Sequence, residues 1–487
     1  MTNREKIAHL TRRFGFGCTP AELDAYEKKG LEGTIEALIE FERTPVDFPF
    51  DPWEFAFYGQ KEVALDPGRF LGWWCMRMVL TQRPLEEKLT VFWHDHFAIS
   101  GSKVEFGPLM LRNNQTLRAL GIGTFKDLLA AMAQDPAMSL WLDCDSNVKG
   151  APNENYAREV MELFSLGVGH YTEKDVQEAA RAFTGWGLRY AVTDANKTPL
   201  YEQAINAVKA NRPLITSAYS PELHDDGPKT ILGQSANFDW QSASAMLAGR
   251  PEAARLITTK LWEFFAYSKP EVEVVDRLAQ TFRASDGSIR AVLYAIARSP
   301  EFYSEKCVRK LVKSPVDFVI PIVRQLNARA IMMGFRKKDS QPWTPVANEI
   351  AGVAGLCAGS MLKMGMLLFY PPNVAGWDWG TAWITTDSMS ERLKFADVLF
   401  QTAPDRAVAE LVRMQMLMAG KGQSEEDVIS WLATGFDVPL DPAKKAVLLE
   451  AFRKNGGTES IKDKMAASKS LGTVVRLMFG MPEFQFC

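Results

Sequence analysis

The chain has 487 residues, of which 47% are hydrophobic and 24% are charged, and its net charge at pH 7 is −3. A chain of this length suits two or three packed lobes rather than one small core. Because acidic and basic side chains nearly balance, we expect neither a nucleic-acid partner nor binding to an anionic membrane surface.

Helical patterns dominate the first 185 residues. Ile7, Leu10 and Phe14 share one face of a predicted helix over about residues 4–14. Residues 19–22 (Thr-Pro-Ala-Glu) combine a capping box with proline at the first helical position, and we expect Gly30 to end the helix that starts there. Further helices are predicted over about residues 31–42, 69–82, 84–98, 107–119, 124–134, 153–166 and 172–185.

The pattern changes between residues 186 and 240, where short apolar runs are separated by Pro, Gly, Asp and Asn. Such runs predict a small β-hairpin or loop excursion. Helical signals resume at about residue 242 and continue to the end of the chain. We therefore predict a mainly α, multi-helical globular protein, with an N-terminal lobe over residues 1–245 and a C-terminal lobe over 246–487.

A weak internal repeat is present. Residues 123–138 align without gaps with residues 287–302, and each segment reads as a short helix that ends at a proline. Because the repeat has no regular period, it indicates duplicated helical units rather than a solenoid.

Targeting and membrane signals are weak. The amino terminus enters an amphipathic helix at once, without a signal segment, so we expect a soluble, cytoplasmic protein. The apolar stretch 350–370 has the length of a membrane span, but it contains Lys363 and leads into two prolines, so we interpret it as a buried helix followed by a loop. The six cysteines include no C-x-x-C pair, which favours reduced core residues.

The first candidate site is the tripeptide that contains His94 and His96, close to the predicted end of a helix. Side chains two residues apart point about 200° apart around a helix, so both bind one ion only if the helix ends there. One interpretation is a divalent-metal or acid–base site. In the other, one histidine bonds a carbonyl and the second packs beside Trp93.

The second candidate is a pair of carboxylates on the helix predicted over 153–166. Glu159 and Glu162 are three residues apart, and such acids repel each other unless a proton, a cation or a metal lies between them. Arg158 as that cation would make the group a structural ion-pair network. Otherwise Glu159 and Glu162 are a general acid and base, or metal ligands.

Two loops complete the set of candidates. His224 and Asp225 are adjacent in a loop, where catalytic sites are often built, although an Asx turn explains them equally well. Trp377, Trp379 and Trp383 lie in a glycine-rich loop, where they either stack on a flat ligand such as a sugar ring or pin the loop to the body of the protein. Motifs of nucleotide-binding, serine-hydrolase and zincin enzymes are missing from the sequence.

Taken together, several blocks resemble one bacterial family, the domain of unknown function 1800. They are residues 9–17, 87–97, 152–159, 167–173, 182–186, 224–230, 313–316 and 370–377, and the resemblance covers about residues 5–485. The sequence departs from the family pattern at Phe164, where many relatives carry histidine, and in the polar stretch 192–213, which looks like an insertion. The resemblance implies no established activity, and relatives often appear exported, although this chain shows no export signal.

Three functional hypotheses remain open. The first is a metal-assisted or acid–base, hydrolase-like enzyme in which His94, His96 and His224 bind a divalent metal and Glu159, Glu162 and Asp225 are catalytic. The second is a non-catalytic binding or assembly protein with a protein partner, whose polar clusters are structural. The third is a glycan-directed enzyme or binder that uses the tryptophan loop for a small-molecule or glycan ligand. The enzyme hypothesis requires at least three of the distant histidines and acids to meet at one accessible point.

Overall fold

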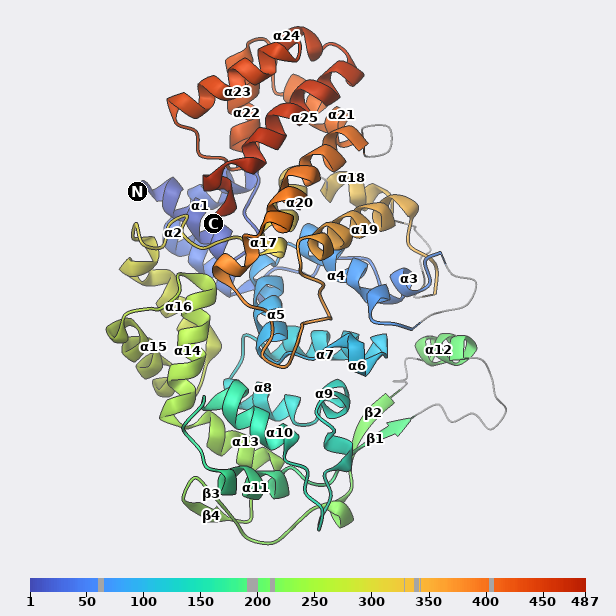
Figure 1. Ribbon diagram of the computed structural model, residues 1–487, viewed down its shortest axis with the longest axis vertical. Helices are drawn as coiled ribbons and strands as arrows, with labels where there is room; N and C mark the ends of the chain where they lie inside the picture. Colours follow the sequence, from blue (N-terminus) through green and yellow to red (C-terminus); the bar gives the residue numbers. More distant parts are fainter. Residues whose placement is uncertain are drawn as a thin grey trace.

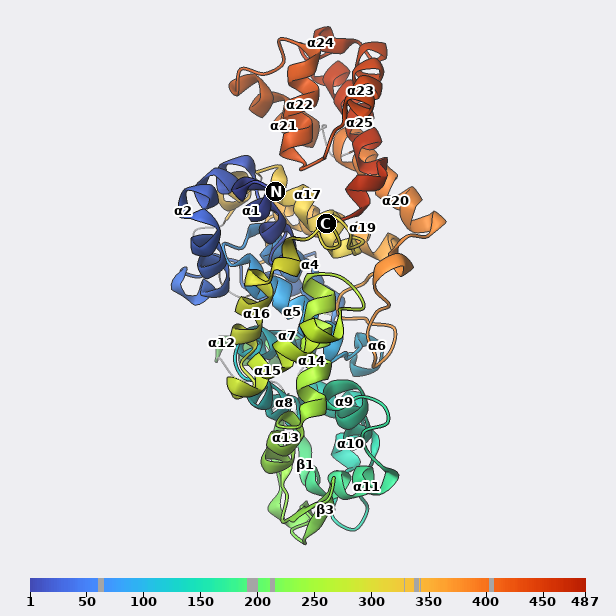
Figure 2. The same ribbon diagram turned by 90° about the vertical axis from the view of Figure 1, so that its left-hand side faces the viewer.

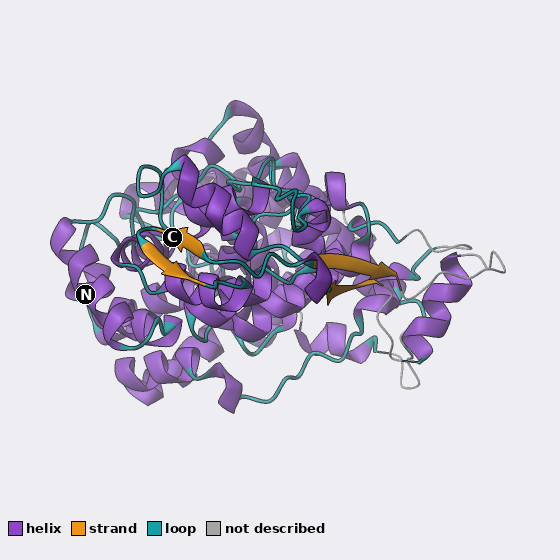
Figure 3. Ribbon diagram, turned by 90° about the horizontal axis from the view of Figure 1, so that it is seen from below, coloured by secondary structure: helices purple, strands orange, loops and turns teal. Residues whose placement is uncertain are grey.

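The computed structural model describes residues 1–487 apart from 60–64, 191–199, 211–214, 328, 337–340, 342 and 403–406. The described residues are mainly helical, and their strands form two antiparallel sheets of two strands each (Figure 3). The prediction of a mainly α fold is therefore confirmed.

The first half of the chain contains most of the predicted helices at the predicted places. The helices observed in this half, predicted or not, are α1 (Asn3–Arg13), α2 (Pro20–Ile39), α3 (Pro52–Ala56), α4 (Gly68–Leu80), α5 (Pro84–His96), α6 (Gly101–Val104), α7 (Gly107–Leu120), α8 (Phe125–Met132), α9 (Pro136–Trp141), α10 (Asn155–Glu159), α11 (Glu173–Ala182) and α12 (Leu200–Lys209).

Helices continue through the second half. They are α13 (Trp240–Ala248), α14 (Pro251–Phe265), α15 (Val272–Ala284), α16 (Ile289–Arg298), α17 (Pro315–Gln325), α18 (Arg329–Gly334), α19 (Asn348–Lys363), α20 (Thr386–Asp397), α21 (Ala407–Met418), α22 (Glu425–Gly435), α23 (Pro442–Lys454), α24 (Gly457–Ser460) and α25 (Lys464–Gly480). The predicted lobe boundary at residue 245 falls inside α13, and the division into lobes stays a prediction.

Local sequence signals explain where α2 begins but not where it ends. The predicted capping box forms, because the Thr19 hydroxyl accepts from the Glu22 amide and the Glu22 carboxylate accepts from the Thr19 amide. Gly30, expected to end the helix, instead forms a kink with φ of +74°. The chain then resumes its helix to Ile39, so two predicted helices are joined as one bent element.

The molecule is elongated, and α5 lies near its centre (Figures 1 and 2). Helices α21 to α25 form one end, and α11 with the strands forms the other. Nearly every side chain of α5 is buried, including Glu87, which accepts hydrogen bonds from Arg77, Arg118 and Trp74. This network holds α5 and thereby positions the His94–His96 tripeptide at its carboxyl end.

The excursion predicted over residues 186–240 contains the two small sheets. β1 (Trp186–Tyr190) pairs with β2 (Ile215–Tyr219), and β3 (Lys229–Ile231) pairs with β4 (Gln234–Ala236). Within the polar stretch 192–213, α12 is a helix that the sequence reasoning did not predict, and residues 192–199 and 211–213 lie outside the described residues.

The two repeated segments meet in space. Thr124 and Ser288 form an antiparallel bridge, in which the Phe125 amide donates to Gly287 and the Ile289 amide donates to Gly123, each at 2.9 Å. Each bridging hydroxyl also caps the helix that follows it, α8 or α16. The sequence repeat therefore corresponds to a pair of equivalent helix starts.

The apolar stretch 350–370 folds as α19 and the turn that follows it. α19 packs against α4 and α17 and ends at Lys363. Among the described helices, we find none with both the length and the apolar character that a membrane crossing requires.

Candidate functional site

His94 lies in an aromatic enclosure formed by Trp74, Phe369 and Trp377. Its Nε2 accepts a hydrogen bond from the Phe369 amide at 3.1 Å, so Nδ1 carries the proton. That Nδ1 is buried and meets no hydrogen-bond acceptor in the described part of the chain. Burial lowers the pKa of His94 to about 3, which keeps the imidazole neutral.

His96 points to a different set of partners. Its Nε2 donates to the carbonyl oxygen of Phe164 at 3.0 Å, and its Nδ1 accepts from Nζ of Lys260 at 3.2 Å. Burial holds its pKa well below the usual value, so this imidazole is also neutral. Lys260, which occupies the lone pair of His96, belongs to α14, and Phe164 belongs to the helix that carries the two predicted acids. His96 therefore bridges these two helices.

The π-helical turn Val160–Ser165, which directly continues α10, makes this contact. A π turn has one residue more than an α turn, so its carbonyl groups are displaced from the regular ladder. Leu163 accepts from Lys260 at 3.1 Å, next to the Phe164 carbonyl that binds His96. The His94–His96 tripeptide and the acid helix are thus linked through backbone carbonyls.

The acids themselves belong to a separate group of charges. The Tyr171 hydroxyl donates to Glu162, while Arg158 pairs with Glu154 and Glu173 rather than bridging the two predicted acids. Burial and the neighbouring charge of Glu162 raise the pKa of Glu159. By contrast, burial lowers the pKa of Lys260, and the charges of Asp95 and Glu263 have a smaller effect that raises it.

Asp95, between the two histidines, is a residue that the sequence reasoning missed, as it missed Lys260. It accepts hydrogen bonds from the Trp377 amide at 2.8 Å and from Nε1 of Trp379 at 2.6 Å. Gly376, at a φ of +87°, lies so close to Asp95 that a side chain there would overlap the carboxylate. No local motif predicts these contacts, because they join residues more than 280 positions apart.

Burial shifts the pKa values of both Asp95 and Lys260. Burial raises the pKa of Asp95 to about 6, although its hydrogen bonds to the tryptophan loop oppose the rise. Burial also lowers the pKa of Lys260, and the charge of Asp95 opposes that fall. Both side chains keep some exposure to solvent. The Asp95 cluster, defined here as Asp95, His96, Lys260 and Trp379, therefore combines perturbed groups with access to solvent.

His224 and Asp225 are bound to the end of α11 and the turn that follows it, and not to α5. Nδ1 of His224 donates to the Thr184 carbonyl at 3.0 Å, and Asp225 forms a two-point ion pair with Arg181. That ion pair lowers the pKa of Asp225 to about 2. The Gly227 amide also donates to Asp225, which is the Asx turn considered above.

The tryptophan loop is packed against the body of the protein. Only 7% of Trp377 and 6% of Trp383 is exposed, so neither ring offers a face to a ligand of any size. Trp379 is half-buried and packs edge-on against Phe264 and Trp383. Of the three predicted platform residues, Trp379 alone retains a partly open ring.

A metal-binding group is not assembled from the described residues, since no three His, Cys, Asp or Glu side chains lie in an arrangement that would hold an ion. At the tripeptide, the Phe369 amide and Lys260 occupy the lone pairs of His94 and His96. The metal role of His94, His96 and His224 stays a prediction that these contacts do not support.

Comparison with known proteins identifies a family. A family model with the description "Protein of unknown function (DUF1800)" matches residues 9–486. No curated protein and no solved structure matches the chain.

Proposed function

We propose that this chain, which belongs to the DUF1800 family of proteins of unknown function, is a hydrolase-like enzyme that uses acid–base chemistry at the Asp95 cluster. The observation that carries the proposal is the half-buried carboxyl of Asp95, which accepts hydrogen bonds from the tryptophan loop, interacts electrostatically with Lys260 and keeps some exposure to solvent.

Asp95 has the character of a general base. A carboxylate whose pKa is about 6 is a better proton acceptor at neutral pH than an ordinary aspartate, whose pKa is 3.8. In the proposed step, Asp95 takes a proton from water while the water oxygen bonds to the electrophilic carbon of the substrate. The bond to the leaving group then breaks, and the leaving group receives the proton from the carboxyl.

Lys260 and His96 have supporting roles. The Lys260 ammonium interacts electrostatically with the Asp95 carboxylate, and it donates hydrogen bonds to His96 and to the Leu163 carbonyl. It therefore supplies a positive charge in a partly dry site, where it stabilises negative charge that develops on the substrate. The partly open ring of Trp379 is the surface on which a flat substrate, including a sugar ring, would pack.

The remaining predicted residues are outside this mechanism. Glu159 and Glu162 form a second, half-buried acidic pair on the same helix that contacts His96, and their catalytic role remains a separate proposal. We assign no step to a metal, because other groups occupy the lone pairs of the neighbouring imidazoles.

A second candidate function is non-catalytic binding or assembly. It is favoured by the contacts of His94, His224 and Asp225, which bond to the backbone or to arginine in ways that orient segments of the fold. The two candidates differ in whether the Asp95 carboxylate is needed for turnover.

The test is a hydrolysis screen of the full chain with p-nitrophenyl esters and p-nitrophenyl glycosides. We expect turnover of at least one substrate, a loss of about 100-fold or more in Asp95→Asn, and no change in the control Asp387→Asn, which alters an exposed acid of α20. We also expect the acidic limb of kcat/KM to lie near pH 6.

A second variant tests whether the pH dependence of the activity comes from the pKa of Asp95. Trp379→Phe removes a hydrogen bond that lowers the pKa of Asp95, so the acidic limb should move to higher pH. Absence of hydrolysis across the screen, or full activity in Asp95→Asn, would refute the enzyme and favour the binding protein.

A further inference from the structure

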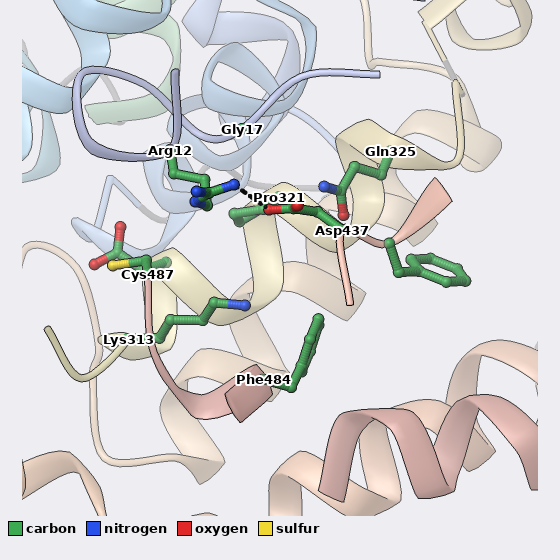
Figure 4. A pocket seen from close by; sticks show the side chains of 10 residues that line it. Arg12, Gly17, Lys313, Pro321, Gln325, Asp437, Phe484 and Cys487 are labelled. Carbon is green, nitrogen blue, oxygen red and sulfur yellow. Dashed lines mark hydrogen bonds and ion pairs between the residues drawn. The ribbon is translucent and has the colours of Figure 1, made fainter. Parts of the chain in front are cut away.

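A small cavity that shares no lining residue with the Asp95 cluster lies where α1, α17 and the carboxyl-terminal segment meet. Its volume is about 20 Å³, and its lining includes Arg12, Gln325, Asp437 and Phe484. Figure 4 shows the ammonium of Lys313 pointing toward the centre of this group. A volume of this size holds about one or two water molecules, which is the size of a very small ligand.

Lys313 lacks an ordinary partner for its charge. Its side chain is 7% exposed, and its ammonium lies 3.7 Å from the centre of the Phe484 ring. Among the described contacts, this ammonium has no hydrogen bond to an oxygen and no ion pair. Burial lowers the pKa of Lys313 to about 7, which reflects the cost of holding the charge there.

Neighbouring guanidinium groups also carry unused donors. Arg12 and Arg309 both pair with Asp437, at 2.8 and 2.7 Å. Nε of Arg12 and Nη1 of Arg309 are nevertheless buried without a hydrogen-bond acceptor in the described structure. Buried donors of charged groups are rarely left unsatisfied, so these atoms point to a missing acceptor.

The charges around the cavity do not balance. Arg13 and Arg392 are buried, and their donors go to backbone carbonyls, a thiol and an amide rather than to carboxylates. Asp317 is already paired with Lys88. The described side chains therefore include more cations than anions: the cations are Arg12, Arg13, Lys88, Arg309, Lys313 and Arg392, and the acids are Asp317 and Asp437.

We propose that this cavity is a binding site for a small carboxylate anion of the size of formate or acetate. The anion accepts hydrogen bonds from Lys313 and from the side-chain amide of Gln325, and it supplies the negative charge that the surrounding cations lack. A second cavity of about 50 Å³ lies on the α2 side and also borders Arg12 and Asp437. This proposal does not depend on the proposed function at the Asp95 cluster, so the experiments can refute either one and leave the other standing.

The test is isothermal titration of the full chain with sodium formate and with sodium acetate in a buffer without other small carboxylates. We expect saturable binding that is weakened about tenfold or more in Lys313→Met, because a charge-assisted hydrogen bond is lost. The control Lys310→Met changes an exposed lysine three residues earlier and should bind as the unmodified chain does. Methionine in place of an unpaired buried cation should not impair folding, which a thermal melt will check.

A second measurement does not depend on any variant. Crystals soaked in bromide should give an anomalous peak in the cavity beside Lys313. A cavity that contains only water, a titration without saturation, or equal binding by Lys313→Met would overturn the proposal.

Discussion

Glu87 is the residue whose replacement best tests the account of the fold. It is fully buried in the middle of α5, where Arg118 donates to both carboxylate oxygens at 2.7 and 2.8 Å and Arg77 and Trp74 donate as well. Despite burial, the two arginines lower the pKa of Glu87 from 4.5 to about 2. A shift of that size corresponds to about 3 kcal/mol of folding free energy at pH 7.

We therefore expect Glu87→Gln to lower the free energy of unfolding by about 3 kcal/mol at pH 7, because two buried guanidinium groups lose their counter-charge. A lowered carboxyl pKa stabilises the protein above the unfolded-state value of 4.5 and loses its effect as the pH falls toward 2. The deficit of the variant should thus shrink to about half by pH 3.

The assay is urea denaturation followed by tryptophan fluorescence at pH 7 and at pH 3. Glu36→Gln is the control, because the Glu36–Arg43 pair is largely exposed and should contribute less than about 1 kcal/mol. An equal loss in both variants, or a deficit of Glu87→Gln that is independent of pH, would refute this view of α5.

Other variants test the tryptophan loop, the core and a helix cap. Gly376→Ala should lower the melting temperature more than Gly380→Ala: both have positive φ, but only the first would overlap Asp95. A raised carboxyl pKa costs stability as the pH rises from 3.8 through about 6. Between pH 4.5 and 7.5, the unfolding free energy of the unmodified chain should therefore fall relative to that of Asp95→Asn. Parallel curves of unfolding free energy against pH would contradict this. Phe164→Ala should cost about 3–5 kcal/mol in urea denaturation by opening a cavity beside His96. Thr172→Ala, which removes the cap of α11, should cost only about 1 kcal/mol.

Much of the fold could be predicted because its signals are local. Caps such as the one at Thr19 and apolar periodicity placed most helices in the first half of the chain. Local signals failed where a residue has two uses: a glycine such as Gly30 can end a helix or bend it, and in α2 it bends the helix. α12 was missed because its segment was interpreted as part of a polar insertion.

The candidate site was predicted less well, for a physical reason. The sequence marked His94, His96 and the tryptophan loop as unusual, but the partner of the loop is Asp95, between the two histidines. Lys260 had no motif to draw attention to it, since a single lysine on an amphipathic helix resembles any surface lysine. Contacts over such separations depend on how whole helices pack, which no short pattern specifies.

The π turn Val160–Ser165 also limits which changes in chain length the protein tolerates. Removing one residue there would restore regular α geometry and rotate everything on one side of the cut by about 100° relative to the other. The carbonyls of Leu163 and Phe164 would then face away from Lys260 and His96. In this turn the number of residues matters as well as their identity. A one-residue deletion would therefore remove the backbone contacts at the end of α5 even if every side chain of the cluster were kept.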